Sequence, residues 1–186
     1  GQGVSNFRTQ TYQGRKVLTW WQGTSVGGHG TGEDVISDGR RIIRTLTPGD
    51  GLTSDVHEFR LVSGGRALIT SYRPVTADLR SIGGPANGTM YDCIASVVDV
   101  ASGRVISRWD ARQHVPITDT ESAKTPGDAA FDPFHMNSIA LDPAGNLIIS
   151  MRNTSAVYDV NPSTGVINWQ LGGKHPTLRA DAGVEF

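Results

Sequence analysis

One stretch, residues 131–173, contains a complete four-strand unit and constrains the fold more than any other feature of the sequence. Its short runs rich in β-branched residues are separated by DPAGN, RNT and NPSTG. Clusters of Pro, Asn, Asp, Ser and Gly supply the positive φ angles and local hydrogen bonds of tight turns. The stretch is therefore predicted to be an antiparallel meander, with strands near residues 137–141, 147–151, 155–160 and 166–171.

The same unit occurs twice more toward the N-terminus, so internal repetition decides the architecture. In the second copy, SVVDVASGRVISRW matches AVYDVNPSTGVINW of the last unit, sharing the Asp-Val ending, the Gly turn and the closing Trp. Its strands are predicted near residues 58–62, 67–72, 94–100 and 105–109. The first copy is weaker, with strands near 7–12, 17–22, 35–38 and 42–47 and hairpin turns at QGRK and DGRR.

Repeated four-strand meanders are typical of a β-propeller, in which each meander is one blade. Because propellers have about 4 to 8 blades, we expect an all-β chain that forms part of a propeller ring. The remaining blades would come from the rest of a longer polypeptide or from a second chain. The alternative is an open all-β sandwich built from the same strands.

The whole chain, residues 1–186, is predicted to form a single partial propeller domain. Two insertions, residues 74–89 and 111–132, lack strand periodicity. Loops longer than about 12 to 15 residues are usually functional or disordered, so these insertions either cap a cavity or pack as surface loops. Blade 1 is expected at about 7–50, blade 2 at about 55–110 and blade 3 at about 133–173, with 174–186 leading into a next blade.

Composition excludes several functional classes. A formal net charge of −1 argues against a generic polyanion partner such as nucleic acid, and no apolar run approaches the roughly 20 residues of a membrane helix. Cys93 stands alone, which excludes an intramolecular disulfide and leaves the redox compartment undecided. The chain opens at GQGVSNF without Met, so the localisation is unknown; removal of an N-terminal segment and a secreted or cell-envelope location remain open.

The candidate site residues lie at the ends of predicted inner strands. His57 and His135 start the first strand of consecutive blades, and Asn137, two residues after His135, is expected on the same strand face. Arg152 ends the second strand of its blade and offers a planar fork of donors that suits a tetrahedral oxyanion. These four side chains are predicted to converge on one cavity that faces the channel of the ring. Each histidine could instead be structural, and Arg152 could pair with an acidic turn residue such as Asp132 or Asp142.

Other candidates are weaker. Trp20 and Trp21 point to opposite faces of one strand, so one could line a substrate pocket while the other packs between blades. His29 lies in VGGHGTGED, which lacks the GKS or GKT ending of a phosphate loop, and a flexible turn is the better interpretation. His114 and His175 lie in Pro-flanked loops. No spacing of His, Cys and acidic residues matches a metal site, and none is expected.

These residues carry a resemblance to a known family. TQTYQGRKVLTWWQG, HEFRLV, ALITSYRP, SIGGPA and FHMNSIALDPAGNLIISMRNTSAVYDVNPSTGVINWQLGGK resemble the arylsulfotransferase family of bacteria and fungi. The likeness spans nearly the whole chain, with FHxNS, SxR and WxLGG elements in order. It implies a six-bladed propeller that moves a sulfuryl group between phenols, without a nucleotide sulfate donor or other cofactor, through a transiently sulfated histidine.

Through this resemblance, His57 corresponds to the family histidine of the second-blade motif, His135 and Asn137 to the FHxN pair, and Arg152 to the arginine that holds sulfate oxygens. A small phenolic substrate is the implied partner. The family's nucleophilic histidine falls in a WQHD-like motif expected to follow GVEF, where this sequence ends. The alternatives are a ligand-binding or scaffold propeller, or an enzyme of different chemistry on a small aromatic metabolite, because fold does not fix function.

Overall fold

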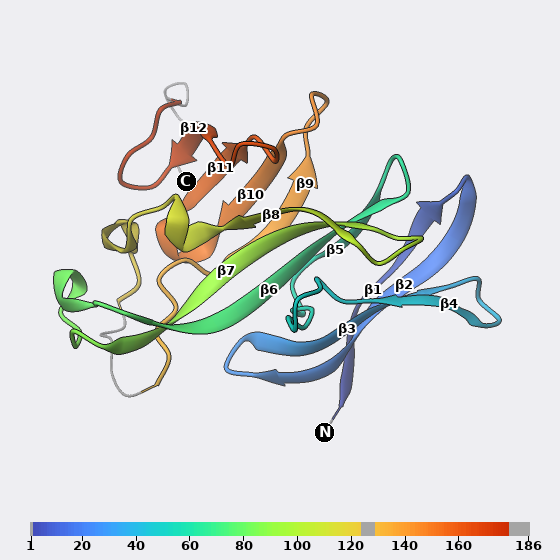
Figure 1. The fold of residues 1–186 in the computed structure, drawn as a ribbon, viewed down its shortest axis with the longest axis horizontal. Helices are drawn as coiled ribbons and strands as arrows, with labels where there is room; N and C mark the ends of the chain where they lie inside the picture. Colours follow the sequence, from blue (N-terminus) through green and yellow to red (C-terminus); the bar gives the residue numbers. More distant parts are fainter. Residues whose placement is uncertain (1, 124–128, 179–186) are drawn as a thin grey trace. The chain divides into compact units, whose positions relative to one another are not determined.

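Three four-stranded antiparallel sheets follow one another along the chain (Figure 1), which confirms the predicted meanders and is consistent with propeller blades. The computed structural model describes residues 2–123 and 129–178. Within these ranges, no helix is long and apolar enough to span a membrane. The strands are β1 (Gly3–Tyr12), β2 (Arg15–Val26), β3 (His29–Ser37) and β4 (Ile42–Leu46) in the first sheet; β5 (Phe59–Val62), β6 (Arg66–Ala77), β7 (Gly88–Asp99) and β8 (Val105–Asp110) in the second; and β9 (Met136–Leu141), β10 (Leu147–Met151), β11 (Ala156–Val160) and β12 (Ile167–Gly172) in the third.

The flexible turn predicted at His29 is wrong. Val26 pairs with His29, and the two residues between them, Gly27 and Gly28, have φ of 61° and 89°. Two consecutive positive φ angles match the right-handed twist of the flanking strands, so the glycines close a long hairpin and His29 begins β3. The QGRK hairpin is confirmed, because Tyr12 pairs with Arg15 across a two-residue turn.

The insertion predicted at residues 74–89 is shorter than expected. β6 continues to Ala77 and β7 already starts at Gly88, and a 3-10 turn, η1 (Arg80–Ile82), lies between them. Figure 1 shows η1 at the far end of the long β6 and β7 strands. The second insertion has no strand in its described part and forms two 3-10 turns, η2 (Ala111–Gln113) and η3 (Ile117–Asp119).

The chain divides into two compact units, and each is described by itself. The first contains residues Gly1–Tyr72 and Ala95–Arg108; the second contains Arg73–Ile94 and Trp109–Phe186. The core of the first unit forms because β2 alternates buried and partly exposed residues, as a strand with one covered face does. Its buried apolar cluster consists of Val17, Ile36, Leu46, Phe59, Ala67, Ile69, Val98 and Val100.

Trp21 is the largest side chain buried in the first unit and is 2% exposed. Its ring lies against the backbone of three glycines, Gly23, Gly30 and Gly32, where any Cβ would come within 2.8 Å of ring carbons. Its indole N–H donates to the Ser54 carbonyl at 2.9 Å. Gly30 and Gly32 of the sequence VGGHGTG are therefore explained by close packing, because only glycine admits the ring and the neighbouring backbone.

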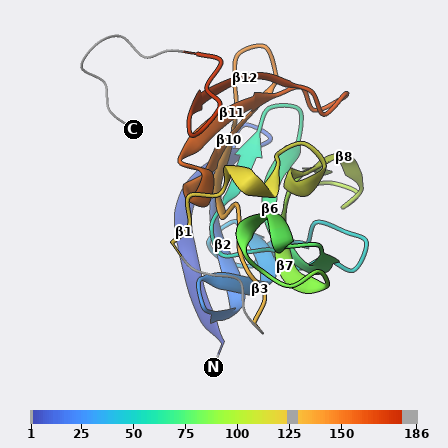
Figure 2. The same cartoon turned by 90° about the vertical axis from the view of Figure 1, so that its left-hand side faces the viewer.

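The second unit packs its sheet around a separate set of apolar side chains. Figure 2 shows β10, β11 and β12 side by side, as their hydrogen-bonded pairing requires. The segment after β12 ties back to the insertion, since Lys174 Nζ donates to the carbonyls of Thr118 and Thr120, both at 2.7 Å. The fully buried members of the core include Trp109, Phe134, Met136, Ile139, Ile149, Tyr158 and Val160.

Asp34 is a fully buried carboxyl group in β3 of the first unit. Among the described residues, neither of its oxygens has a hydrogen bond of good geometry. Burial raises the pKa of Asp34 well above its ordinary value; the nearby Ser54 hydroxyl opposes this shift, and the charges of Asp55, Glu33 and Glu58 add to it. Ionisation of Asp34 therefore opposes folding.

Replacing Gly32 with Ala tests the close packing around Trp21. The new Cβ would collide with the Gln22 carbonyl oxygen and lie 2.8 Å from the Trp21 ring. We expect the free energy of unfolding, measured by urea denaturation, to fall by about 1–3 kcal/mol. Gly3→Ala is the matched control, because a Cβ added there would meet no atom within 4 Å, and equal losses in both variants would contradict the packing explanation.

Replacing Asp34 with Asn tests the raised pKa. A raised pKa means that the folded protein keeps a proton which the unfolded chain releases once the pH exceeds about 4. The free energy of unfolding of the wild type should therefore fall as the pH rises from about 4 through the pKa that Asp34 has in the folded protein. Asn cannot ionise, so D34N should have the higher thermal midpoint at pH 8, with an advantage that shrinks toward pH 4. If the difference in thermal midpoint between D34N and the wild type did not change with pH, Asp34 would have its ordinary pKa.

Candidate functional site

In the first unit, His57 is held by Asp55. The imidazole Nδ1 of His57 hydrogen-bonds to Oδ1 of Asp55, and the backbone N–H of His57 donates to the same oxygen at 3.0 Å. Oδ2 accepts the Gly30 N–H at 2.6 Å. Asp55 is fully buried and the His57 side chain is 22% exposed, so the pair presents an imidazole edge at the surface with its carboxylate behind it.

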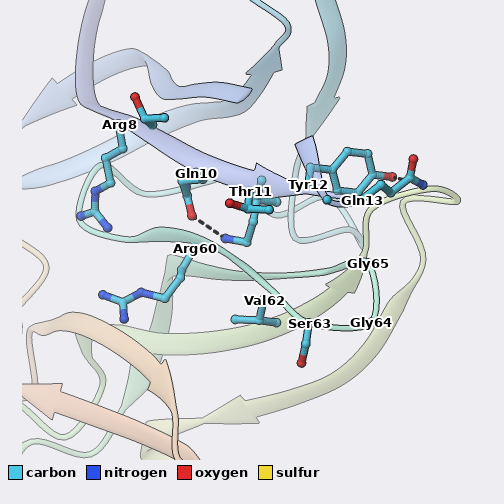
Figure 3. A pocket seen from close by; sticks show the side chains of 13 residues that line it. Arg8, Gln10, Thr11, Tyr12, Gln13, Arg60, Val62, Ser63, Gly64 and Gly65 are labelled. Atoms are coloured by element: carbon cyan, nitrogen blue, oxygen red, sulfur yellow. Dashed lines mark hydrogen bonds between the residues drawn. The ribbon is translucent and has the colours of Figure 1, made fainter. Parts of the chain in front are cut away.

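A groove of about 650 Å³ runs between β1 and β5 in the same unit. Figure 3 shows Arg8 and Arg60 at one end of it, away from the Gln13–Gly14 and Ser63–Gly65 turns. Both guanidinium groups pair with the buried carboxylate of Glu58, Arg8 at 2.6 Å and Arg60 at 3.5 Å. Two cations share one anion at this end of the groove, which therefore carries a net positive charge and would attract a negatively charged ligand.

In the second unit, His135 has the same kind of partner. Its Nδ1 lies 2.6 Å from Oδ2 of Asp132, and its backbone N–H donates to Oδ1 of Asp132 at 2.8 Å. His135 is 4% exposed and has φ of 53°, in the left-handed region that L residues rarely adopt. The two hydrogen bonds from one residue to one carboxylate stabilise this backbone conformation.

Arg152 lies beside His135 through the backbone. Its N–H donates to the His135 carbonyl at 2.9 Å, and it opens a 3-10 turn, η4 (Arg152–Thr154). The Arg152 side chain is exposed, and Nε donates to Oδ1 of Asn153 at 3.2 Å. No ion pair to Asp132 or Asp142 is found in the described part of the chain, so the structural alternative for this arginine receives no support.

Asn153 connects the pieces of this region. Its side-chain amide donates to the Asp132 carbonyl at 2.7 Å, and its N–H donates to the Phe134 carbonyl at 2.9 Å. Its own carbonyl accepts the Glu121 N–H at 2.6 Å. Asn153 thereby fixes η4 against the segment that carries His135 and joins both to the insertion.

The expectation that His135 and Asn137 share one strand face rested on a rule that does not apply here. β9 starts at Met136, and the left-handed residue before it lies outside the alternation of the strand. A register shift between Ser150 and Met151 accompanies this irregular start. His135 is buried and Asn137 is exposed.

The two tryptophans do lie on opposite faces. Trp21 is buried against the glycines, whereas Trp20 is partly exposed and stacks on Phe7 with ring centroids 6.2 Å apart. Its indole N–H donates to Gln22 at 3.0 Å. Trp20 is therefore the member of the pair that a substrate ring could reach.

The histidines and the arginine could be found from the sequence, but the groups that hold them were missed. Asp132 and Asn153 were not predicted to position His135 and Arg152, and Asp55 was not predicted to position His57. The short spacings Asp-x-His and Asp-x-x-His before an inner strand were the available signal. His57 belongs to the first unit, whereas His135, Asn137 and Arg152 belong to the second. Their convergence on one cavity therefore stays a prediction.

Chemically, a carboxylate on Nδ1 fixes the tautomer of an imidazole and leaves Nε2 as the basic nitrogen. Such a group can act as a nucleophile or, once protonated, as a donor to an oxyanion. Arg152, which is joined to His135 through the backbone, adds an exposed guanidinium, a permanent cation with geometry suited to sulfate or carboxylate oxygens.

A comparison with protein families gives a match over most of the chain. The family model for Arylsulfotransferase (ASST) matches residues 8–184, nearly the entire chain. No curated protein matches significantly. Since the matched region contains all three sheets and both aspartate-held histidines, the chain belongs to the arylsulfotransferase family.

Proposed function

We propose that this chain belongs to an aryl sulfate sulfotransferase, which moves a sulfuryl group from an aryl sulfate ester to a phenol through a histidine intermediate. The observation that carries the proposal is the placement of His135, anchored by Asp132, directly beside Arg152. The family match supplies the substrate class. By the resemblance, the histidine that carries the sulfuryl group lies in a further blade.

Sulfuryl transfer spreads negative charge over three non-bridging oxygens and a leaving phenolate. Fixed donors aimed at those oxygens stabilise the transition state most. Arg152 would bind two oxygens with its planar fork, and the imidazoles of His135 and His57 would donate to the sulfuryl group or to the leaving oxygen. Asn137, exposed at the start of β9, would bind substrate.

The aspartates explain how these histidines keep one orientation. Each carboxylate accepts Nδ1–H and is itself held by backbone N–H groups, so the imidazole cannot rotate. This is the condition required of a donor to an oxyanion. Trp20 would contribute an aromatic surface for the phenol ring.

Replacing Asp132 with Asn tests whether the carboxylate sets the tautomer of His135. In the wild type, ¹⁵N NMR should show the proton on Nδ1, because a carboxylate can only accept a hydrogen bond there. In D132N the amide can donate instead, so the Nε2–H tautomer should appear. The His57 signals, governed by Asp55, are the internal reference. Unchanged His135 signals would contradict the assignment.

Replacing Arg152 with Lys tests the oxyanion role. Lysine keeps the charge but loses the fork of donors, so transfer should fall by one to a few orders of magnitude, corresponding to about 2–4 kcal/mol of lost stabilisation. His135→Ala should reduce transfer at least as much. The assay measures phenol release from an aryl sulfate in the presence of a second phenol, with the protein in its native assembly.

The matched control is Arg80→Lys. Arg80 is also an exposed arginine, but it pairs with the carboxylate of Asp78 and lies outside the proposed site. It should retain wild-type transfer. Wild-type rates in R152K and His135→Ala would remove the sulfotransferase assignment and favour the ligand-binding or scaffold propeller.

A further inference from the structure

The glycine-rich segment around His29 is built against the His57 site. Gly30 donates its N–H to the Asp55 carboxylate, which also holds His57. Gly32 and Ser54 exchange two backbone hydrogen bonds, at 3.1 Å and 2.9 Å. A Cβ on Gly30 would lie 2.6 Å from the Val56 nitrogen. The start of β3 is therefore fixed directly onto the segment that carries His57.

Tyr72 lies between two histidine rings. Its ring meets the His29 imidazole edge-on, with centroids 4.6 Å apart and planes at 76°, and lies 6.1 Å from the His57 imidazole at 50°. All three residues belong to the first unit and are partly exposed. Asp55 anchors both ends of this His29–Tyr72–His57 cluster, through Gly30 and through His57 itself.

Two imidazoles near one aromatic ring suit a reaction that needs a cation and a base together. Asp55 holds Nδ1 of His57, so the other ring nitrogen, Nε2, is the one that can face a sulfuryl oxygen. His29 supplies a second imidazole, and imidazole is the side chain best able to take up a proton near pH 7. The Tyr72 ring, which neighbours both imidazoles, offers an aromatic surface to the ring of an aryl sulfate or phenol.

We propose that His29 is a further catalytic residue, which takes the proton of the acceptor phenol; this inference rests on the proposed sulfotransferase function. As the phenol O–H bond breaks, its proton bonds to an imidazole nitrogen of His29. The oxygen electron pair forms the new O–S bond, and the bond from sulfur to the sulfuryl carrier breaks with its pair remaining on the carrier. His29 then releases the proton to water, and the phenolate released from the aryl sulfate donor takes up a proton from water, so protons balance over a cycle.

The test compares two acceptors in wild type and His29→Gln. An unsubstituted phenol, with a pKa of about 10, needs a base, whereas a nitrophenol is already ionised in an assay at pH 8.5. Loss of a general base typically costs about 10²–10⁴-fold. H29Q should therefore sulfate the unsubstituted phenol at least about 100-fold more slowly and the nitrophenol within a few-fold of wild type, measured as sulfated acceptor by mass spectrometry.

Misfolding would lower both rates equally, so the ratio between acceptors is the diagnostic quantity. His29→Asn gives the same comparison if H29Q is poorly folded. His175→Gln, which changes an exposed histidine paired with Asp119 in the second unit, should leave both rates unchanged. If H29Q lost activity equally with both acceptors, or lost no activity with either, the role of His29 would be overturned while the proposed sulfotransferase function would stand. Absence of transfer in the wild type would overturn the proposed function and this inference with it.

Discussion

A carboxylate that holds both the ring and the backbone of a histidine is the interaction on which the candidate site depends. Asp55 does this for His57 and Asp132 for His135, in each case just before the first strand of a sheet. A histidine on a bend would otherwise sample several rotamers and two tautomers. Two hydrogen bonds to one acceptor remove that freedom and prepare the ring before any ligand arrives.

The segment that carries each aspartate is held in place by contacts with a neighbouring element. Around Asp55, glycines and the Trp21 ring bring β3 against the segment of residues 54–57. Around Asp132, Asn153 performs the equivalent task with a side-chain amide. The two blades thus reach a similar result with different residues, which is expected of diverged repeats. The shared outcome is a histidine whose orientation is determined by the scaffold.

The strands could be predicted from the sequence because their signals are local. Alternation in KVLTWWQ and ALITSY, together with turns such as QGRK, locates elements without knowledge of their neighbours. The extensions of β3 and β6 were missed because glycine and proline reduce strand signals, and only cross-strand pairing reveals why they are tolerated. His29 was misread as part of a turn for the same reason.

The sequence predicted which residues form the candidate site better than it predicted the side chains and backbone groups that hold them. Arg152 and His135 meet because antiparallel pairing returns β10 to the start of β9, which the repeat pattern already implied. The link from Asn153 to Asp132 and the fork between Asp55, His57 and Gly30 depend on contacts that no periodicity encodes. The left-handed backbone of His135 also broke the alternation that the Asn137 placement had assumed.

That left-handed backbone restricts how this position can diverge during evolution. Among L residues, Asn and Asp tolerate positive φ most readily, and glycine does so without steric cost, whereas β-branched residues are strongly disfavoured. A lineage that abandoned the chemistry but kept the blade would accordingly drift toward Asn or Gly at position 135 and retain Asp132 as a turn residue. The residue found there in a related chain would distinguish a retained active site from an inherited scaffold.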